Sequence, residues 1–158
     1  MSEKKKGEEI FMKSKKSLEQ GICIVMIIAG HASSDHNLTS EYLSQRLGVS
    51  DSYLKKITRQ LVLAGLIESN SGKNGGFTLK KKPEKISLYD IFIAIEGKES
   101  FVSATGLVEK VFFHNKTLAH KREKEVLDIF KNAELLYKDY LKTCTLDRFL
   151  DDISSYPL

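Results

Sequence analysis

The chain has 158 residues, of which 41% are hydrophobic and 29% charged, and its net charge at pH 7 is +4. This composition fits a soluble globular domain with an appendage, and the mild positive charge permits nucleic-acid binding without requiring it. The longest apolar run, residues 22–29, is far shorter than the ~20 residues of a membrane span, and the N-terminus lacks the apolar stretch of a signal peptide.

Residues 1–11 are mostly charged, and we expect them to form a flexible tail. A first helix is predicted from about Lys13 to Ala29, ended by Gly30. Its segment ICIVMIIA is apolar on all sides, which is typical of a central core helix. Cys23 lies in this segment and is predicted to be a small buried hydrophobe. The first helix begins with three lysines, Lys13, Lys15 and Lys16. They either contact a nucleic-acid backbone or simply keep the helix end solvated.

Both cysteines are predicted to be reduced, because Cys23 and Cys144 lie far apart and belong to no CxxC or Cys/His spacing. This pattern argues against a disulfide framework and favours the cytoplasm. The loop after the first helix holds His31, Asp35 and His36, which are metal-binding residue types. Their spacing lacks the i, i+4 geometry of a helical site, so we expect no metal here.

A pair of short helices joined by a tight turn is predicted next. Thr39 is a good N-cap for the first, in which Leu43 and Leu47 share a face. Gly48 is suited to ending it, and Ser50 is placed to cap the second helix. In that second helix four apolar residues recur at three- and four-residue steps, so we expect them to face the core: Leu54, Ile57, Leu61 and Ala64.

The opposite face of the second helix is basic and rich in hydroxyl groups. Rotation by 100° per residue places Ser52, Lys56 and Arg59 there, with Lys55 beside them. Such a face suits the major groove of DNA. The alternative is that these charges only solvate a surface helix, as charged outer faces generally do.

A β-ribbon follows and weakens that alternative. Residues 66–69 and 77–79 are predicted strands, and the seven residues between them include three glycines. This tip can approach a phosphate backbone and present Lys73 and Asn74, and the lysines of residues 80–82 can add phosphate contacts. A nucleotide-binding glycine loop is disfavoured, because no GK[ST] sequence is present and no helix opens after the loop.

A further helix, 88–95, is predicted to begin after Ser87 and to end at Gly97, which closes the N-terminal domain. A less regular linker, 98–115, comes next. Residues 116–143 then show a helical pattern whose length, ~40 Å, exceeds any surface that the small domain offers.

We therefore predict a twofold homodimer built on the helix over 116–143. Its apolar stripe holds Val126, Ile129, Phe130, Ala133, Tyr137 and Tyr140, widened by Leu136 and Leu141. The alternative is a helix folded back on its own domain. Thr145 is expected to cap a last short turn whose apolar residues, Leu146, Phe149, Leu150 and Ile153, pack on the partner.

Several stretches together resemble the Rrf-two (Rrf2) family of bacterial winged-helix transcription regulators. They are SDSYLKKITRQLVLAGLIES, the wing SGKNGGFTL, the following KKPEKISLYDIFIAIEG and the closing TLDRFL. The resemblance covers Met12 to about Leu150. It implies that the second helix of the pair enters the major groove and that the wing reaches the minor groove. We expect no enzymatic activity, because the sequence shows no nucleophile–base pair and no paired carboxylates at a meaningful spacing.

The resemblance assigns DNA contacts to three groups of residues. The reading helix carries Ser50, Ser52, Tyr53, Lys55, Lys56 and Arg59, the supporting helix opens with Ser40 near a phosphate, and the wing tip carries Lys73, Asn74 and Gly75. Cluster-binding members of the family have three cysteines in the linker, whereas residues 98–115 have none. Since an iron–sulfur cluster needs about four ligands, we expect a cluster-free chain with no cofactor.

The sequence thus predicts a mainly α fold with a small β-wing. Four segments are expected: the tail 1–11, a winged helix-turn-helix domain 12–97, the linker 98–115 and a helical dimerisation region 116–158. The predicted function is a cytoplasmic homodimeric repressor on a palindromic operator in double-stranded DNA, with a small-molecule or protein effector left open. The alternative is a winged-helix module that binds a partner enzyme.

Overall fold

The computed structural model describes residues 16–32, 37–72 and 75–151. Its α-helices and strands are α1 (Lys16–Gly30), α2 (Ser40–Leu47), α3 (Asp51–Leu63), β1 (Ile67–Asn70), β2 (Gly76–Leu79), α4 (Leu88–Glu96), α5 (Leu107–Val111) and α6 (Lys116–Thr143). Three 3-10 helices are η1 (Pro83–Lys85), η2 (Phe113–Asn115) and η3 (Leu146–Phe149). Expectations for the tail 1–11, Lys13, Lys15, Asp35, His36, Lys73, Asn74 and Ile153 lie outside the described residues.

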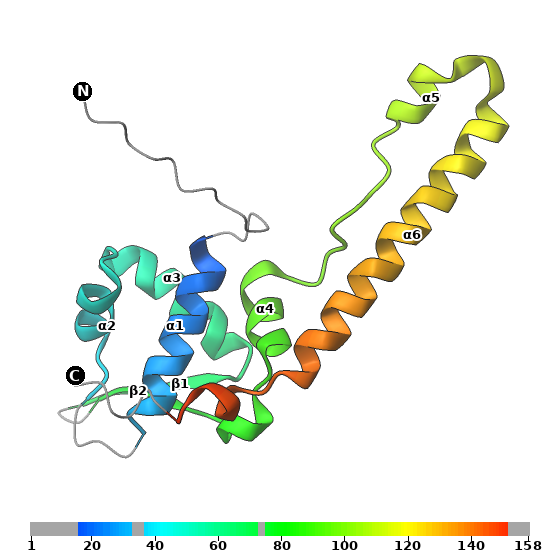
Figure 1. Cartoon of the computed structure of the whole chain (residues 1–158). Coiled ribbons are helices and arrows are strands. Elements are labelled where there is room, and N and C mark those ends of the chain that lie inside the picture. The colour runs from blue at the N-terminus through cyan, green and yellow to red at the C-terminus, as the bar shows by residue number, and fades with distance from the viewer. Residues whose placement is uncertain (1–15, 33–36, 73–74, 152–158) are drawn as a thin grey trace, which may run out of the picture.

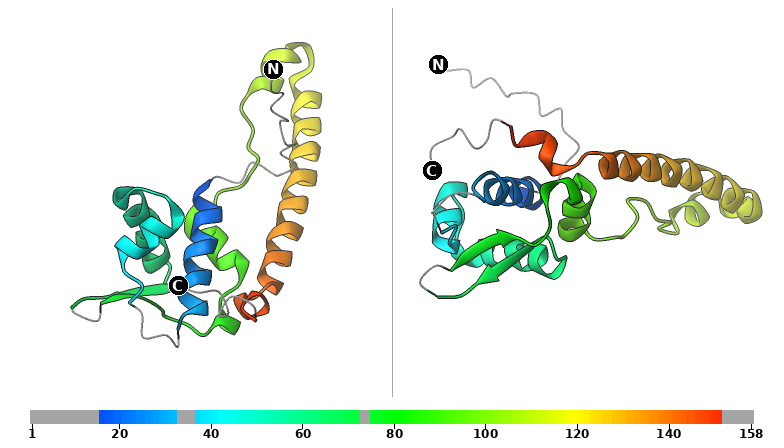
Figure 2. Two further views of the ribbon diagram at one scale, coloured as in Figure 1. Left: turned by 60° about the vertical axis from the view of Figure 1, so that its left-hand side comes forward. Right: turned by 90° about the horizontal axis from the view of Figure 1, so that it is seen from below.

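The molecule has a compact N-terminal part and one long arm (Figure 1). Helices α1 to α4 and the two strands form the compact part, and α6 projects away from it with α5 near its far end. Both further views show the same projection (Figure 2). The predicted fold class, mainly helical with a small β-wing and a long C-terminal helix, is confirmed.

Local hydrogen bonds explain where the paired helices begin and end. The Thr39 hydroxyl accepts a hydrogen bond from the Tyr42 amide at 3.2 Å, and the Ser50 hydroxyl accepts one from the Tyr53 amide at 3.4 Å. Gly48 takes φ +63°, a left-handed conformation in which a side chain would be strained. The predicted caps of α2 and α3 are therefore confirmed.

One apolar core joins the helices of the compact part. It is built from fully buried side chains of α1, α3, β1 and α4, among them Ile24, Leu54, Leu61, Ile67 and Ile91. Two predictions of burial are wrong. Cys23 is exposed, because α1 is covered on fewer sides than its apolar run indicates. Ala64 is exposed because it is the C-cap of α3, where the chain turns away at Gly65.

The wing is an antiparallel pair in which Ile67 lies opposite Leu79 and Asn70 opposite Gly76. Its second strand also contacts the segment before α2, since the Phe77 amide donates to the Leu38 carbonyl at 3.0 Å. A Cβ on Gly76 would lie 3.1 Å from the Leu38 backbone, so the close approach favours glycine. This contact fixes the base of the wing beside α2.

Helix α4 connects the compact part to the arm. Its N-terminus forms a capping box, in which the Asp90 amide donates to the Ser87 hydroxyl and the Ser87 amide donates to the Asp90 carboxylate. Ser87 also pairs with Thr145 in an isolated β-bridge, and the Leu88 amide donates to the Cys144 carbonyl at 2.8 Å. The C-terminal end of α6 is thereby joined to the start of α4.

Side chains add to this attachment of the arm. Tyr137 and Leu141 of α6 pack on the core, and Leu146 just beyond α6 is fully buried in it. The expectation that Leu146 packs on a partner is wrong, because the chain turns back through η3 after α6 and places this side chain in its own core. Phe149, predicted to lie on the same apolar face, is 42% exposed.

The linker is more regular than the sequence indicates. It runs along the arm, forms α5 and η2 at the far end, and then turns into α6. Helix α5 packs against α6. Among the described residues, no helix combines the length and the apolar character that crossing a membrane requires.

Candidate nucleic-acid interface

Helix α3 has one buried and one exposed face, as its periodicity predicts. Leu54, Ile57 and Leu61 are at most 1% exposed, and the buried Thr58 hydroxyl donates to the Leu54 carbonyl at 3.0 Å. On the other face four polar side chains are exposed: Ser52, Lys55, Lys56 and Arg59. We call these four residues the basic face. A single helix thus presents three cations on a surface backed by the core.

The start of α3 supplies further polar groups next to the basic face. The Ser50 hydroxyl, which caps the helix, lies 3.2 Å from the Ser52 hydroxyl, and both residues are exposed. Unpaired amides at a helix N-terminus attract anionic groups, a phosphate among them. Tyr53 differs from its neighbours, because it is half-buried and packs against the core.

Helix α2 packs against α3. Ser40 is the first residue of α2 and is half-buried, with Thr39 capping the helix beside it. Ser44 is buried, and its hydroxyl donates to the Glu41 carbonyl at 2.9 Å. Ser44 therefore lies on the buried side of α2, whereas Thr39 at the N-terminus of the helix is exposed.

The wing tip depends on glycine at position 75. A Cβ there would lie 2.6 Å from the Asn70 carbonyl oxygen and 2.8 Å from that of Gly72, so any side chain would displace the backbone. The Gly75 amide donates to the Gly72 carbonyl at 2.8 Å, which closes the turn. Lys73 and Asn74, which this turn carries, lie outside the described residues. At the base of the wing, Lys80, Lys81 and Lys82 are exposed.

The arm carries an exposed apolar stripe. Val126 is 51% exposed, Ile129 68%, Phe130 55% and Tyr140 69%, and Ala133 between them is exposed as well. Tyr137 was predicted to be in this stripe, but its ring makes edge contacts with Phe92 and Phe101 of its own chain at centroid distances of 5.9 Å. The exposed stripe therefore consists of Val126, Ile129, Phe130, Ala133 and Tyr140, and Tyr137 is not part of it.

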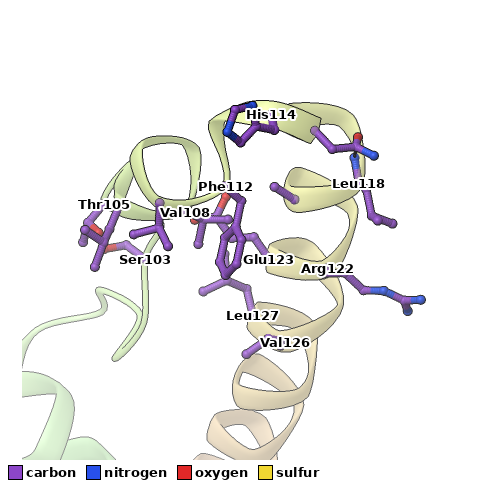
Figure 3. A pocket seen from close by; sticks show the side chains of 14 residues that line it. Ser103, Thr105, Val108, Phe112, His114, Leu118, Arg122, Glu123, Val126 and Leu127 are labelled. Carbon is purple, nitrogen blue, oxygen red and sulfur yellow. Dashed lines mark hydrogen bonds between the residues drawn. The ribbon is translucent and has the colours of Figure 1, made fainter.

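An open apolar hollow of about 700 Å³ lies between α5 and α6 (Figure 3). In this view Val108 and Phe112 project toward α6, where Leu127 faces them, whereas Arg122 points away. Val126 lines the hollow and also begins the exposed stripe, so the two apolar surfaces are continuous. The hollow was not predicted from the sequence, although the apolar residues of LVEKVFF, 107–113, were a signal for a short helix.

The site is therefore a helix-turn-helix with an exposed basic face, a β-wing beside it and an apolar arm, which defines the class of winged-helix DNA-binding regulators. The sequence model described as "Rrf2: Iron-dependent Transcriptional regulator" matches residues 14–152. The chain belongs to this family of transcriptional regulators, which are not enzymes.

Individual relatives agree with this assignment. The chain is 46% identical over 101 residues to the HTH-type transcriptional regulator YwgB of Bacillus subtilis (strain 168), and the matched part spans 64% of each chain. A crystal structure of a transcriptional regulator from Listeria innocua is 26% identical with a TM-score of 0.63, covering 88% of this chain and 86% of that one.

A third comparison concerns the fold alone. The structure of CymR, the global cysteine regulator of B. subtilis, superposes with a TM-score of 0.58 at 23% identity, covering 94% of this chain and 100% of that chain. The arm and the compact part therefore belong to one architecture that these proteins share.

The family description names iron, but this chain's residues do not fit an iron–sulfur site. The sequence holds two cysteines, one on α1 and one at the end of α6, and none in residues 98–115. No group of three or more His, Cys, Asp or Glu side chains that could hold a metal ion occurs among residues 16–32, 37–72 and 75–151. No step of the proposed mechanism uses iron.

Proposed function

We propose that the protein is a homodimeric, sequence-specific repressor that binds a palindromic operator in double-stranded DNA. The exposed basic face of α3, opposite three fully buried core residues, carries the proposal. The core fixes the helix, so Lys56 and Arg59 can be held in a major groove without further folding.

We assign two different tasks to the cations. Arg59, Lys56 and Lys55 lie on the face that would enter the groove, where side chains discriminate base edges. Ser40, Ser50 and the lysines of the wing lie where the phosphate backbone would pass, and such contacts add affinity that falls with salt but carries no sequence information. Ser52, Tyr53, Asn74 and Gly75 complete the proposed contact surface.

The exposed stripe of the arm supports the homodimer. Side chains such as Ile129 and Tyr140 leave large apolar areas in water, and a second copy offers a matching stripe of the same length. A twofold dimer presents two basic faces to one duplex, which suits an operator with two half-sites about one helical turn apart. Occupation of such a site would block transcription.

We infer that the regulatory signal reaches the protein without an iron–sulfur cluster, as a small molecule or a protein partner, and that the protein works in the cytoplasm. An absorption spectrum of the protein purified without oxygen tests the first inference. We expect no visible charge-transfer band, and a band at cluster stoichiometry would contradict the inference.

Selection from random DNA, followed by binding titrations at several salt concentrations, tests the DNA-binding proposal. We expect a palindromic consensus, a steep loss of affinity with salt and a complex containing two chains. An unselective interaction with DNA, or none, would instead favour a winged-helix module that binds another protein.

A further inference from the structure

A buried carboxylate joins the linker to the arm at the side of α6 that faces α4. Glu134 lies in the C-terminal half of α6 and is 7% exposed, although charged side chains are seldom buried without partners. Its Oε2 atom accepts a hydrogen bond from the Ser100 hydroxyl at 2.6 Å and another from the Phe101 amide at 3.0 Å. Its Oε1 atom forms an ion pair with Lys138, one turn further along α6.

The same group of residues is fastened to the compact part. The Phe101 ring makes edge contacts with Phe92 of α4 at 5.8 Å and with Tyr137 of α6 at 5.9 Å, measured between ring centroids. The Lys138 ammonium group lies 5.4 Å from the centre of the Phe101 ring. We call Glu134, Ser100, Phe101 and Lys138 the arm latch. It connects the linker, α4 and α6 at one point.

The position of the latch determines what it can resist. The arm's backbone attachment lies at Cys144 and Thr145, which bond and pair with Leu88 and Ser87. Glu134 lies ten residues before Cys144, which is ~15 Å along the helix. A bond at this distance from the attachment opposes tilting of the arm far more effectively than a bond at the attachment itself.

From this geometry we propose that Glu134 is a positioning residue that sets the angle between the arm and the DNA-reading part, and thereby the half-site spacing that the dimer accepts. This proposal rests on the proposed dimeric DNA-binding function. The arm has 28 residues, or ~42 Å, so a tilt of ~10° displaces its far end by ~7 Å, about two base-pair steps. A fixed angle between the arm and the DNA-reading part therefore determines which half-site spacing the dimer accepts.

Glu134→Ala removes the latch, and Asp139→Ala is its matched control. Asp139 is also a carboxylate of α6 that pairs with a lysine, Lys142 at 2.8 Å, but its side chain is 65% exposed. Five residues separate it from Glu134, which at 100° per residue places it on another side of α6. Both variants lose one carboxylate and gain a residue that favours helices.

The probe is the duplex that the wild-type chain selects from random DNA, together with duplexes in which two base pairs are inserted or deleted between the half-sites. For the wild type we expect each change to weaken binding about tenfold or more. For Glu134→Ala we expect the loss to shrink to about threefold or less, with an unchanged affinity for one isolated half-site. Asp139→Ala should behave like the wild type.

Amide hydrogen exchange of Phe101 reports on the latch without DNA. We expect faster exchange in Glu134→Ala than in Asp139→Ala, because the acceptor of this amide is lost. If exchange accelerates while the spacing preference stays at the wild-type level, the positioning role is wrong and DNA binding is unaffected. If the Phe101 amide stays protected, the latch itself is wrong.

If Glu134→Ala fails to fold, Ser100→Ala replaces it in the same measurements. Ser100→Ala removes one hydroxyl and keeps the ion pair between Glu134 and Lys138. We then expect an intermediate loss of spacing preference, and a wild-type preference would overturn the proposal. A wild-type chain that binds no paired half-sites would overturn the proposed function and the positioning role together, and the exchange of the Phe101 amide would still show whether the latch exists.

Discussion

At the scale of single residues, the exposed face of α3 and the wing are expected to make two different kinds of DNA contact. Arg59 lies on the basic face, where its planar guanidinium group can donate two hydrogen bonds to a guanine. Lys56 lies on the same face and can reach base edges as a single point charge. Lysines of the wing would meet phosphates, which are the same in every sequence.

We predict that Arg59→Ala weakens binding to the selected operator by about 1–3 kcal/mol and weakens binding to unrelated DNA much less. Lys56→Ala should act in the same direction. Lys73→Ala should weaken binding to both duplexes about equally, because a phosphate contact carries no sequence information. Fluorescence anisotropy with both duplexes measures the difference.

Lys124→Ala on the exposed surface of the arm is the control for loss of one positive charge. It should leave operator binding near the wild-type level. If Arg59→Ala and Lys124→Ala behave alike, the basic face does not read bases, and α3 has to be placed differently on DNA.

A second prediction at this scale concerns the pH dependence of stability. Hydrogen bonds from Lys138 first, then from Ser100 and the Phe101 amide, lower the pKa of Glu134 to about 2 from an ordinary value of 4.5. Because the carboxylate is stabilised in the folded state, its contribution is fully present above pH 4.5 and is lost as the pH falls from 4.5 toward 2.

Glu134→Gln keeps the size of the side chain and removes this titration. We expect it to be less stable than the wild type at pH 7 and to lose less further stability between pH 4.5 and 2, so that the two curves converge in acid. Urea unfolding at a series of pH values measures this. Parallel curves for the two proteins would show that Glu134 titrates normally.

At the scale of the elements, attachment of the arm depends on a side chain that lies beyond α6. Leu146 is fully buried and packs in the same core as α1, α3 and α4. Its amide donates to the Ile86 carbonyl at 2.8 Å, which joins η3 to the segment before α4. Removing its side chain leaves a cavity at the point where the arm begins.

We predict that Leu146→Ala lowers the free energy of unfolding by about 2–5 kcal/mol, the usual cost for a buried leucine. Phe149→Ala is the matched control in the same 3-10 helix, and it should cost less because Phe149 is 42% exposed. Thermal and urea unfolding of both variants provide the comparison. Equal losses would contradict the assignment of Leu146 to the core.

The sequence predicted those elements whose signals are local. Thr39, Gly48 and Ser50 specify the ends of α2 and α3 through their own side chains or backbone, and the structure has all three caps where they were expected. The basic face follows from the period of one helix. The extent of α6, Lys116–Thr143, was predicted correctly for the same reason.

The predictions that failed depended on contacts between distant parts of the chain. An apolar run cannot show which side of α1 stays uncovered, so Cys23 was placed inside. Leu146 was assigned to a partner because nothing in its neighbourhood shows that the chain turns back into its own core. The contact of Glu134 with Ser100 and Phe101 spans more than thirty residues and has no local signal.

At the scale of the whole molecule, the arm determines whether the protein presents one basic face, as a monomer, or two, as a dimer. The compact part has its own core, whereas α6 exposes a line of apolar side chains between Val126 and Tyr140. Helix α5 covers only the side of α6 that lines the hollow. We therefore expect a stable monomeric fold in the compact part and an association that depends on the stripe.

We predict that Ile129→Asp breaks the dimer. Burying isoleucine contributes about 1.5–3 kcal/mol, and twofold symmetry counts each substitution twice, so the dimer should weaken by about 3 kcal/mol or more, roughly a hundredfold in dissociation constant. Leu135→Asp is the control: Leu135 is 58% exposed, and six residues of rotation place it away from the stripe. Sedimentation equilibrium should show a monomer for Ile129→Asp and a dimer for Leu135→Asp. Since a monomer keeps one basic face, Ile129→Asp should still bind a single half-site while losing the gain from the second. Dimers in both variants would mean that the stripe is not the contact between copies.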